Sequence, residues 1–209
     1  MKTHASVLLT AQSGSGKSYL ASYLIQKINC KRKWIIDRSG EYNLPGFIIF
    51  DLTAANIHEL PIFLSTYAYV TIRPEFLRRE NEMRVINYIA QLAFEMRNTF
   101  IVFEECHEYI DKKDPKPYIQ SIATAGRKYG INSLFITQRP NLLNSTIRSQ
   151  TNFKIAGKMT DPRDYEAIRP YFANYWIIPR LPPRHFLFRT PDGTEFIFST
   201  ENIKVEHYG

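Results

Sequence analysis

Residues 11–18 read Ala11-Gln12-Ser13-Gly14-Ser15-Gly16-Lys17-Ser18. They follow the apolar run Ala5–Thr10, which predicts a buried strand, and their end opens a stretch, Lys17–Asn29, with the pattern of a helix. The glycines at 14 and 16 allow the backbone to curl so that successive N–H groups face inward and bind phosphate oxygens. The amino end of the helix adds its positive dipole end. A strand, this loop and a helix in that order predict a phosphate-binding loop.

The residues of the loop have distinct expected roles. Lys17 can reach the β and γ phosphates of a nucleoside triphosphate, and the hydroxyl of Ser18 can bind Mg²⁺. We expect the nucleotide to be held by Gln12, Ser13, Gly14, Ser15, Gly16, Lys17, Ser18 and Tyr19. Ala11 stands where the usual G-x-x-x-x-G-K-[ST] pattern begins with a glycine, but the curled backbone and the helix dipole do not depend on that position.

Two adjacent carboxylates follow the apolar run Thr99–Phe103, which predicts another buried strand. A strand covered on both faces exposes charges only at its end, and in an open α/β sheet that end faces the ligand crevice. Glu104 is expected to hold Mg²⁺, and Glu105 is expected to orient and deprotonate a water that attacks the γ phosphate. A carboxylate that activates water favours hydrolysis over transfer to a small acceptor, and no N-K-x-D motif of a GTPase is present.

Apolar runs alternate with longer amphipathic stretches along most of the chain, which predicts an α/β fold with a mostly parallel sheet flanked by helices. Further strands are predicted over Trp34–Asp37, Phe47–Phe50, Ala68–Ile72, Ser133–Thr137 and Phe153–Ala156, and helices over Glu75–Arg97, Tyr118–Tyr129, Leu142–Arg148 and from Asp161 onward. His185–Arg189 and Glu195–Ser199 flank a Pro-Asp-Gly turn and predict a hairpin. We expect one domain over residues 1–209, with a C-terminal hairpin extension at about 180–200, reached through the linker-like stretch Pro179–Pro183.

The composition narrows the class of protein. The 209 residues carry a formal net charge of +7, and residues 120–189 hold eleven Lys or Arg against three acids. This concentration predicts a surface that meets a polyanion with one side, or else an ordinary solvated basic surface. Two cysteines exclude a disulfide scaffold, and no stretch resembles a signal peptide or a membrane span. We therefore expect a cytoplasmic protein without a membrane partner.

Further motifs, in order over residues 5–170, resemble those of the FtsK–HerA superfamily of ring-forming, DNA-pumping ATPases. They are Asp37-Arg38-Ser39-Gly40-Glu41-Tyr42, Gly126-Arg127-Lys128-Tyr129-Gly130, Gln138-Arg139-Pro140, Arg148-Ser149-Gln150-Thr151-Asn152 and Asp161-Pro162-Arg163-Asp164. The resemblance implies the RecA-like fold of P-loop NTPases of the ASCE class. A chain little longer than the motor is similar to the genome-packaging ATPases of viruses with double-jelly-roll capsids, including turreted icosahedral viruses of archaea.

The resemblance also implies roles for single residues. Gln138 would be the polar sensor that touches the γ phosphate or the attacking water. Arg127 would be the arginine finger offered to a neighbouring subunit's nucleotide, with Arg148 as the next candidate and a helix-end cation as the alternative. Asp37 and Glu41 would couple the state of the γ phosphate to a neighbour, or would form a structural turn. The expected catalytic set is thus Lys17, Glu105, Gln138 and Arg127, and the expected metal ligands are Ser18 and Glu104.

The function implied is an ATP-driven translocase of double-stranded DNA that packages a viral genome into a preformed capsid. ATP and Mg²⁺ would be its cofactors, and duplex DNA, a hexameric or pentameric ring of the same chain and capsid vertex proteins its partners. It would act in the cytoplasm of an infected cell or with the virion. Loops 73–84 and 112–116 are candidate DNA contacts.

Three other functions remain open at this point: a HerA-like helicase or chromosome-processing motor, a P-loop small-molecule kinase, and a basic adaptor that binds nucleic acid without hydrolysing ATP.

Overall fold

The computed structural model describes residues 4–75 and 78–205. Within these residues the strands are β1 (Ser6–Thr10), β2 (Arg32–Ile36), β3 (Ile48–Leu52), β4 (Tyr69–Pro74), β5 (Thr99–Phe103), β6 (Asn132–Thr137), β7 (Phe153–Ala156), β8 (His185–Arg189) and β9 (Glu195–Ser199). The α-helices are α1 (Lys17–Lys27), α2 (Leu60–Thr66), α3 (Arg79–Met96), α4 (Pro117–Ala125), α5 (Ser145–Gln150) and α6 (Pro162–Ile168). Short 3-10 helices cover Ile57–Glu59, Cys106–Glu108, Gly126–Tyr129, Arg169–Tyr171 and Tyr175–Arg180.

In the described part of the chain, nine strands form one sheet in the order β3-β4-β2-β5-β6-β1-β7-β8-β9. Strands β1 to β7 pair in parallel, and β8 and β9 add an antiparallel hairpin at one end. Leu8 of β1 lies between Phe135 of β6 and Lys154 of β7. The carboxyl ends of β1, β5 and β6 therefore lie side by side at one edge, and this edge carries the expected chemistry.

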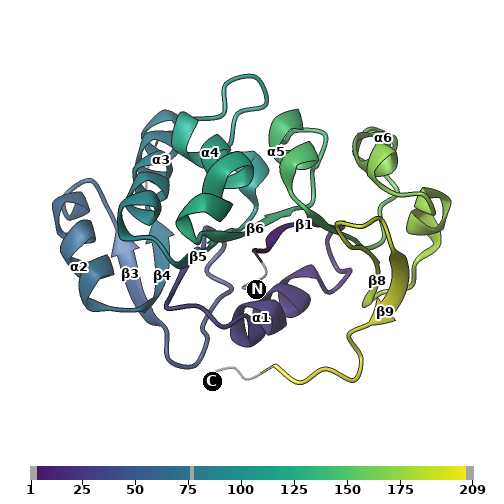
Figure 1. The fold of residues 1–209 in the computed structure, drawn as a ribbon, viewed down its shortest axis with the longest axis horizontal. Coiled ribbons are helices and arrows are strands. Elements are labelled where there is room, and N and C mark those ends of the chain that lie inside the picture. Colours follow the sequence, from purple (N-terminus) through teal and green to yellow (C-terminus); the bar gives the residue numbers. More distant parts are fainter. Residues whose placement is uncertain (1–3, 76–77, 206–209) are drawn as a thin grey trace.

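Helices cover both faces of the sheet (Figure 1). On one face, α2 to α5 pack on alternate residues of the central strands, and Trp34, Phe103 and Phe135 are among the fully buried side chains of that layer. On the other face, α1 packs on the opposite set, with Leu20 and Ile25 fully or almost fully buried. A third cluster joins α6 and the 3-10 helices after it to β7 and β8. These layers confirm the predicted α/β fold.

Most predicted elements are present, with shifts at their ends. The strand Phe153–Ala156 and both hairpin strands have the predicted bounds. The long helix begins at Arg79 rather than at Glu75, and positions 76 and 77 of its predicted start lie outside the described residues. Pro179–Pro183, predicted as a linker, lies partly in the 3-10 helix Tyr175–Arg180, because Ile178 and Leu181 are buried in the third cluster. Over the described ranges, no helix is long and apolar enough to cross a membrane.

Candidate nucleotide-binding site

The predicted phosphate loop connects β1 to α1 at the carboxyl edge of the sheet. Gly14 and Gly16 have φ of 76° and 86°, the left-handed conformation that glycine adopts without strain. Seven of the eight predicted nucleotide-binding residues line one cavity of about 400 Å³. Other segments of the chain complete its wall, and the full lining is Gln12, Ser13, Gly14, Gly16, Lys17, Ser18, Tyr19, Glu41, Glu105, Gln138, Pro183 and Arg184. The eighth, Ser15, is a buried residue of the loop and does not line the cavity.

Ala11, which stands where the usual loop has a glycine, lies next to a glycine, Gly157, at the end of the neighbouring strand β7. Ala11 is fully buried, and a Cβ added to Gly157, which follows β7, would lie 2.8 Å from the Cβ of Ala11 and 2.9 Å from Cε1 of Phe186. The methyl group that replaces the first glycine of the loop therefore occupies room that Gly157 leaves free.

Gly157→Ala is expected to destabilise the protein by about 1–3 kcal/mol, the range for overpacking a well-packed interior. The added methyl group cannot fit unless Ala11 or Phe186 moves. Urea unfolding measures the change, and the double variant Ala11→Gly/Gly157→Ala should recover part of it because one of the two clashes is removed. Equal stability of Gly157→Ala and the natural protein would contradict this packing.

Lys17 and Glu105 form a buried ion pair at the centre of the cavity. Nζ of Lys17 donates to Oε1 of Glu105 at 2.7 Å, and the backbone N–H of Gln138 donates to Oε2 at 3.2 Å. Nδ1 of His107 lies 3.3 Å from the same Oε2. Burial alone would raise the pKa of Glu105, but His107, Lys17 and the Gln138 amide outweigh it and lower that pKa. Glu105 is thus held ionised, the form that a general base requires.

Glu105 also has an unusual backbone. Its φ of 41° and ψ of 47° are left-handed, which is uncommon for a residue with a side chain. Such strain persists only where the surroundings fix the conformation, and it gathers at functional sites. Here the turn directs the carboxylate of Glu105 toward Lys17, and the 3-10 helix Cys106–Glu108 follows at once.

Glu104 has the environment that a cation would satisfy. It is almost fully buried, and its Oε2 has no hydrogen-bond partner among the described residues. Burial, together with the like charges of Glu105 and Asp37, raises the pKa of Glu104 to about 7. An unpartnered carboxylate oxygen beside two further acids fits a hard divalent cation. No group of three or more His, Cys, Asp or Glu that could hold a metal ion by itself occurs among the residues described.

Glu104→Gln is expected to stabilise the nucleotide-free protein by about 1–3 kcal/mol at pH 8 and to have little effect at pH 5. Because the pKa of Glu104 in the folded state, about 7, lies above its ordinary value of 4.5, the folded state binds more protons between these values. Stability contributed by this group is therefore lost as pH rises through that window. Urea unfolding in a chelator at both pH values measures it. A difference between the variant and the natural protein that is equal at pH 5 and pH 8 would contradict the assignment.

Asp37 is placed near the site but serves the backbone. Its buried carboxylate accepts the N–H groups of Glu41 at 3.0 Å and Tyr42 at 3.1 Å, and Nε of Arg73 lies 3.4 Å away. The structural turn that the sequence left open is therefore present. Glu41 reaches the cavity wall.

Arg127 lies far from its own phosphate loop. It belongs to the 3-10 helix Gly126–Tyr129, which leads into the amino end of β6, whereas the loop lies at the carboxyl edge. Its side chain lines a different cavity, of about 780 Å³, together with Lys31 and Asn98. The arginine cannot complete its own subunit's site in this conformation, so its finger role stays a prediction about a neighbour. Arg148, the next candidate, donates from Nη1 to the carbonyl of Pro140 at 2.6 Å.

The cations of the basic stretch 120–189 lie at both edges of the sheet, and a single surface for a polyanion stays a prediction. Arg127 and Lys128 precede β6 at the amino edge, while Arg139 follows it at the carboxyl edge. Lys154 is buried within β7. The physical reason is that each strand crosses the sheet, so charged residues before and after it are carried to opposite edges.

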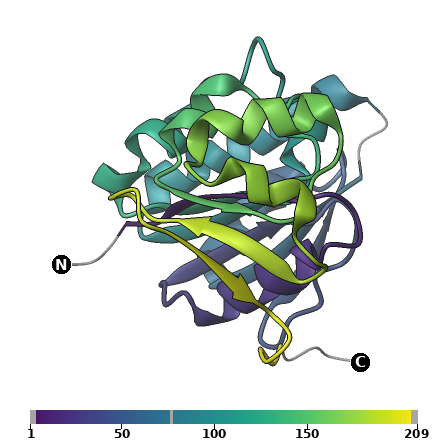
Figure 2. The same cartoon turned by 90° about the vertical axis from the view of Figure 1, so that its right-hand side faces the viewer.

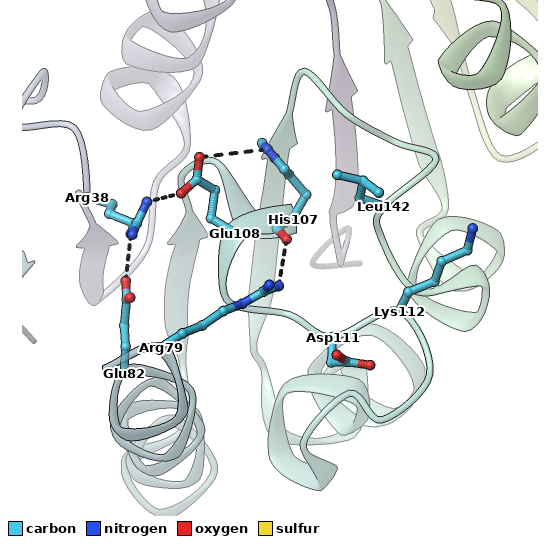
Figure 3. A pocket seen from close by; sticks show the side chains of 8 residues that line it. All are labelled: Arg38, Arg79, Glu82, His107, Glu108, Asp111, Lys112 and Leu142. Atoms are coloured by element: carbon cyan, nitrogen blue, oxygen red, sulfur yellow. Dashed lines mark hydrogen bonds and ion pairs between the residues drawn. The ribbon is translucent and has the colours of Figure 1, made fainter. Parts of the chain in front are cut away.

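A third cavity, of about 640 Å³, lies beside the segment that follows the carboxylate pair, and its lining is Arg38, Arg79, Glu82, His107, Glu108, Asp111, Lys112 and Leu142 (Figure 3). Arg38 donates from Nε to Glu82 at 2.9 Å and from Nη1 to Glu108. Glu108 lies 3.9 Å from Nε2 of His107, whose other nitrogen faces Glu105. A continuous series of contacts thus connects the expected base with this cavity.

Two residues of the site were not predicted from the sequence. His107 contacts Glu105 and also the Oγ1 of Thr137 at 2.9 Å, and its place two residues after Glu105 was the available signal. Arg184 approaches the phosphate loop from the segment before β8, and no local pattern in the sequence marks it.

Comparison with known proteins decides the family. Residues 2–165 match the family model described as "Helicase HerA, central domain". The chain belongs to this family. It is a P-loop ATPase of the FtsK–HerA superfamily, as the motifs implied.

Curated relatives are helicases by name. A probable helicase of Methanocaldococcus jannaschii is 31% identical over 151 residues, which are 69% of this chain and 29% of that protein. The DNA double-strand break repair helicase HerA of Pyrococcus furiosus is 34% identical over 71 residues, or 32% of this chain and 13% of that protein. The chain thus matches less than a third of the length of these relatives.

Solved structures match the fold over most of the chain. The genome packaging NTPase B204 of Sulfolobus turreted icosahedral virus 2, in complex with ATP-gammaS, has a TM-score of 0.72 at 19% identity and covers 95% of this chain and 98% of its own. VirB4 of Thermoanaerobacter pseudethanolicus has a TM-score of 0.67 at 13% identity, with 99% and 90% covered. At these identities the likeness establishes the shared fold.

Proposed function

We propose that this chain hydrolyses ATP to move along double-stranded DNA, and that it packages a viral genome into a preformed capsid. The observation that carries the hydrolysis is the convergence of Lys17, Glu105 and Gln138 in one cavity at the carboxyl edge of the sheet. Packaging is supported by the similarity in fold to a viral genome packaging NTPase, with a TM-score of 0.72 over 95% of this chain. Capsid vertex proteins and the virion or infected cytoplasm would be its surroundings.

The chemistry follows from the positions of the side chains. Glu105 is held ionised and would accept the proton of the attacking water, while Lys17 would leave it to bind the β and γ phosphates. Ser18 and Glu104 would hold Mg²⁺, which when bound supplies positive charge against the phosphate oxygens. The side chain of Gln138 lines the same cavity and would contact the γ phosphate or the water.

The amino edge of the sheet is the surface that we propose for the DNA backbone. Apart from Arg127, which we assign to a neighbour's nucleotide, exposed cations gather where chain segments enter β2, β5 and β6, and they are Lys27, Lys31, Arg97 and Lys128. None of the four has an ion pair with an acid in the described ranges. By contrast, Arg73, Arg84 and Lys116 of loops 73–84 and 112–116 are paired with Asp37, Glu80 and Asp114.

Lys31→Glu/Lys128→Glu is expected to weaken duplex binding uniformly across sequences. The slope of log affinity against log salt should fall by about one for each DNA phosphate that the variant no longer neutralises. Fluorescence anisotropy over a salt series measures it, with Lys112→Glu/Lys116→Glu as the matched control at the other edge. A larger loss of affinity in the control pair would place the DNA at the carboxyl edge.

A HerA-like helicase or chromosome-processing motor is the second candidate, and the family match and the curated relatives favour it. Forked and blunt duplexes separate the two functions. A packaging motor should displace a third strand from a blunt duplex while leaving the duplex paired, whereas a helicase should release single strands from a fork. Release of strands from the fork at the rate of ATP hydrolysis would contradict packaging.

A small-molecule kinase is disfavoured because the family match is to the central domain of a helicase. Phosphate recovered on an acceptor, rather than as free phosphate, would revive that alternative. An adaptor that never hydrolyses ATP would show normal DNA binding and no ATP turnover in the natural protein.

A further inference from the structure

A corner of the C-terminal region is fixed onto the phosphate loop. The backbone N–H of Arg184 donates to the carbonyl of Ser15 at 3.0 Å. The carbonyl of Arg184 accepts from the N–H of Thr200 at 2.9 Å and from its hydroxyl at 3.4 Å. These bonds hold Arg184 at φ 61°, a left-handed conformation that costs energy for a residue with a side chain. The hairpin β8–β9 is thereby attached to the loop.

The side chain of Arg184 lies over the start of α1. A Cβ added to Gly16 would be 3.2 Å from Cγ of Arg184, so the stem of the arginine packs directly on the loop backbone. Its guanidinium carbon lies 5.5 Å from the ring centroid of Tyr19. Arg184 is exposed, it lines the nucleotide cavity with Pro183, and within the described residues it has no ion pair. The guanidinium therefore lies over the ring of Tyr19, and Arg184 is accessible from solvent.

The tail after β9 completes the same corner. The hydroxyl of Tyr19 donates to the carbonyl of Ile203, and the N–H of Ile203 donates to the carbonyl of Thr200 at 3.3 Å. Figure 1 shows this tail running back beside α1, and Figure 2 shows the hairpin lying across the near end of the sheet. Hydrogen bonds to Ser15 and Thr200 thus hold Arg184, and a hydrogen bond to Ile203 holds Tyr19.

We propose that Arg184 and Tyr19 form the platform for the base of a bound purine nucleoside triphosphate. The inference rests on the proposed nucleotide binding at the phosphate loop. With the β and γ phosphates at Gly16 and Lys17, the nucleoside must leave the loop beside the first turn of α1, where Tyr19 and Arg184 lie. A planar guanidinium and an aromatic ring, held 5.5 Å apart, both stack readily on a base, and Pro183 adds an apolar edge.

Tyr19 lies within the part of the chain that the family model matches, but Arg184 and the residues that hold the corner lie outside it. The family model ends at residue 165, whereas Arg184, Thr200 and Ile203 come later. The core motifs would therefore bind the phosphates, and the C-terminal hairpin would recognise the nucleoside.

Binding of ATP and of inorganic tripolyphosphate, both with Mg²⁺, tests the platform by calorimetry. Arg184→Ala is expected to weaken ATP binding about tenfold, within the range measured for a base stacked on a side chain, and to leave tripolyphosphate binding within twofold. Arg184→Gly should give the same loss, and because glycine suits the left-handed corner it guards against misfolding. Arg180→Ala, an exposed arginine of the preceding 3-10 helix outside the cavity lining, should change neither affinity.

Several outcomes would overturn the platform. Equal weakening of both ligands would assign Arg184 to the phosphates, and full rescue by Arg184→Lys would show that charge rather than stacking matters. Unchanged ATP binding in Arg184→Gly would remove the residue from the site. If instead the natural protein bound neither ligand, the proposed nucleotide binding itself would fail, which separates the two claims.

Discussion

Glu105→Gln should reduce ATP turnover by about 10²–10⁴-fold, the contribution typical of a positioned general base, while ATP still binds. The amide keeps the size of the side chain and can still accept from Lys17, which donates to Oε1 at 2.7 Å, but it cannot take a proton from water. Release of free phosphate measures turnover, and calorimetry measures the affinity for ATP.

Glu108→Gln is the control for this variant. Glu108 lies three residues later, contacts Arg38 and is about 41% exposed at its side chain, so its loss should change turnover little. Turnover in Glu105→Gln within twofold of the natural protein would remove Glu105 from the chemistry. Loss of ATP binding in that variant would show instead that the ion pair maintains the loop.

Arg127→Ala should lower turnover by about 10³–10⁵-fold if the arginine acts as a finger on a neighbour's nucleotide. Without the arginine, the charge that develops on the transferred phosphoryl group loses a cationic partner. The nucleotide concerned is a neighbour's, because Arg127 lies at the amino edge of the sheet and its own phosphate loop at the carboxyl edge. DNA-independent turnover must be measured, since a residue that only binds DNA would affect the stimulated rate alone.

Mixing two inactive variants tests action between subunits. Lys17→Ala spoils a subunit's own nucleotide site but leaves its Arg127, whereas Arg127→Ala keeps the site but lacks the finger. Mixed subunits should regain turnover wherever an intact site meets an intact arginine. No recovery from the two inactive variants would contradict action between subunits. Full activity of Arg127→Ala alone would assign the finger to another residue, and Arg148→Ala is the next variant to mix.

The sequence predicted those strands whose buried residues follow one another in a continuous run. The buried runs of β1, β5, β6 and β7 are continuous, so their strands were placed within one or two residues. Helix α2 was missed because it spans seven residues and contains Pro61 near its start. The strand order could not be derived, because pairing depends on contacts between segments far apart in the chain.

The centre of the site was predictable, and its periphery was not. Lys17 and Glu105 come from separate motifs, but both follow buried parallel strands, so the carboxyl edge brings them together. Arg184 and Gly157 act through packing against the phosphate loop, which no spacing in the sequence reveals. The position of Arg127 at the amino edge follows from its place before β6. The subunit whose nucleotide it would contact is a separate molecule and cannot be derived from one chain.

The rate of ATP hydrolysis per subunit, measured against protein concentration with and without blunt duplex DNA, tests the coupling most directly. We expect a rate that rises with concentration as neighbours complete the sites, rises further with DNA, and loses the DNA effect at high salt. A rate that is constant at every concentration and indifferent to DNA would contradict a motor whose subunits share their sites and act on duplex DNA.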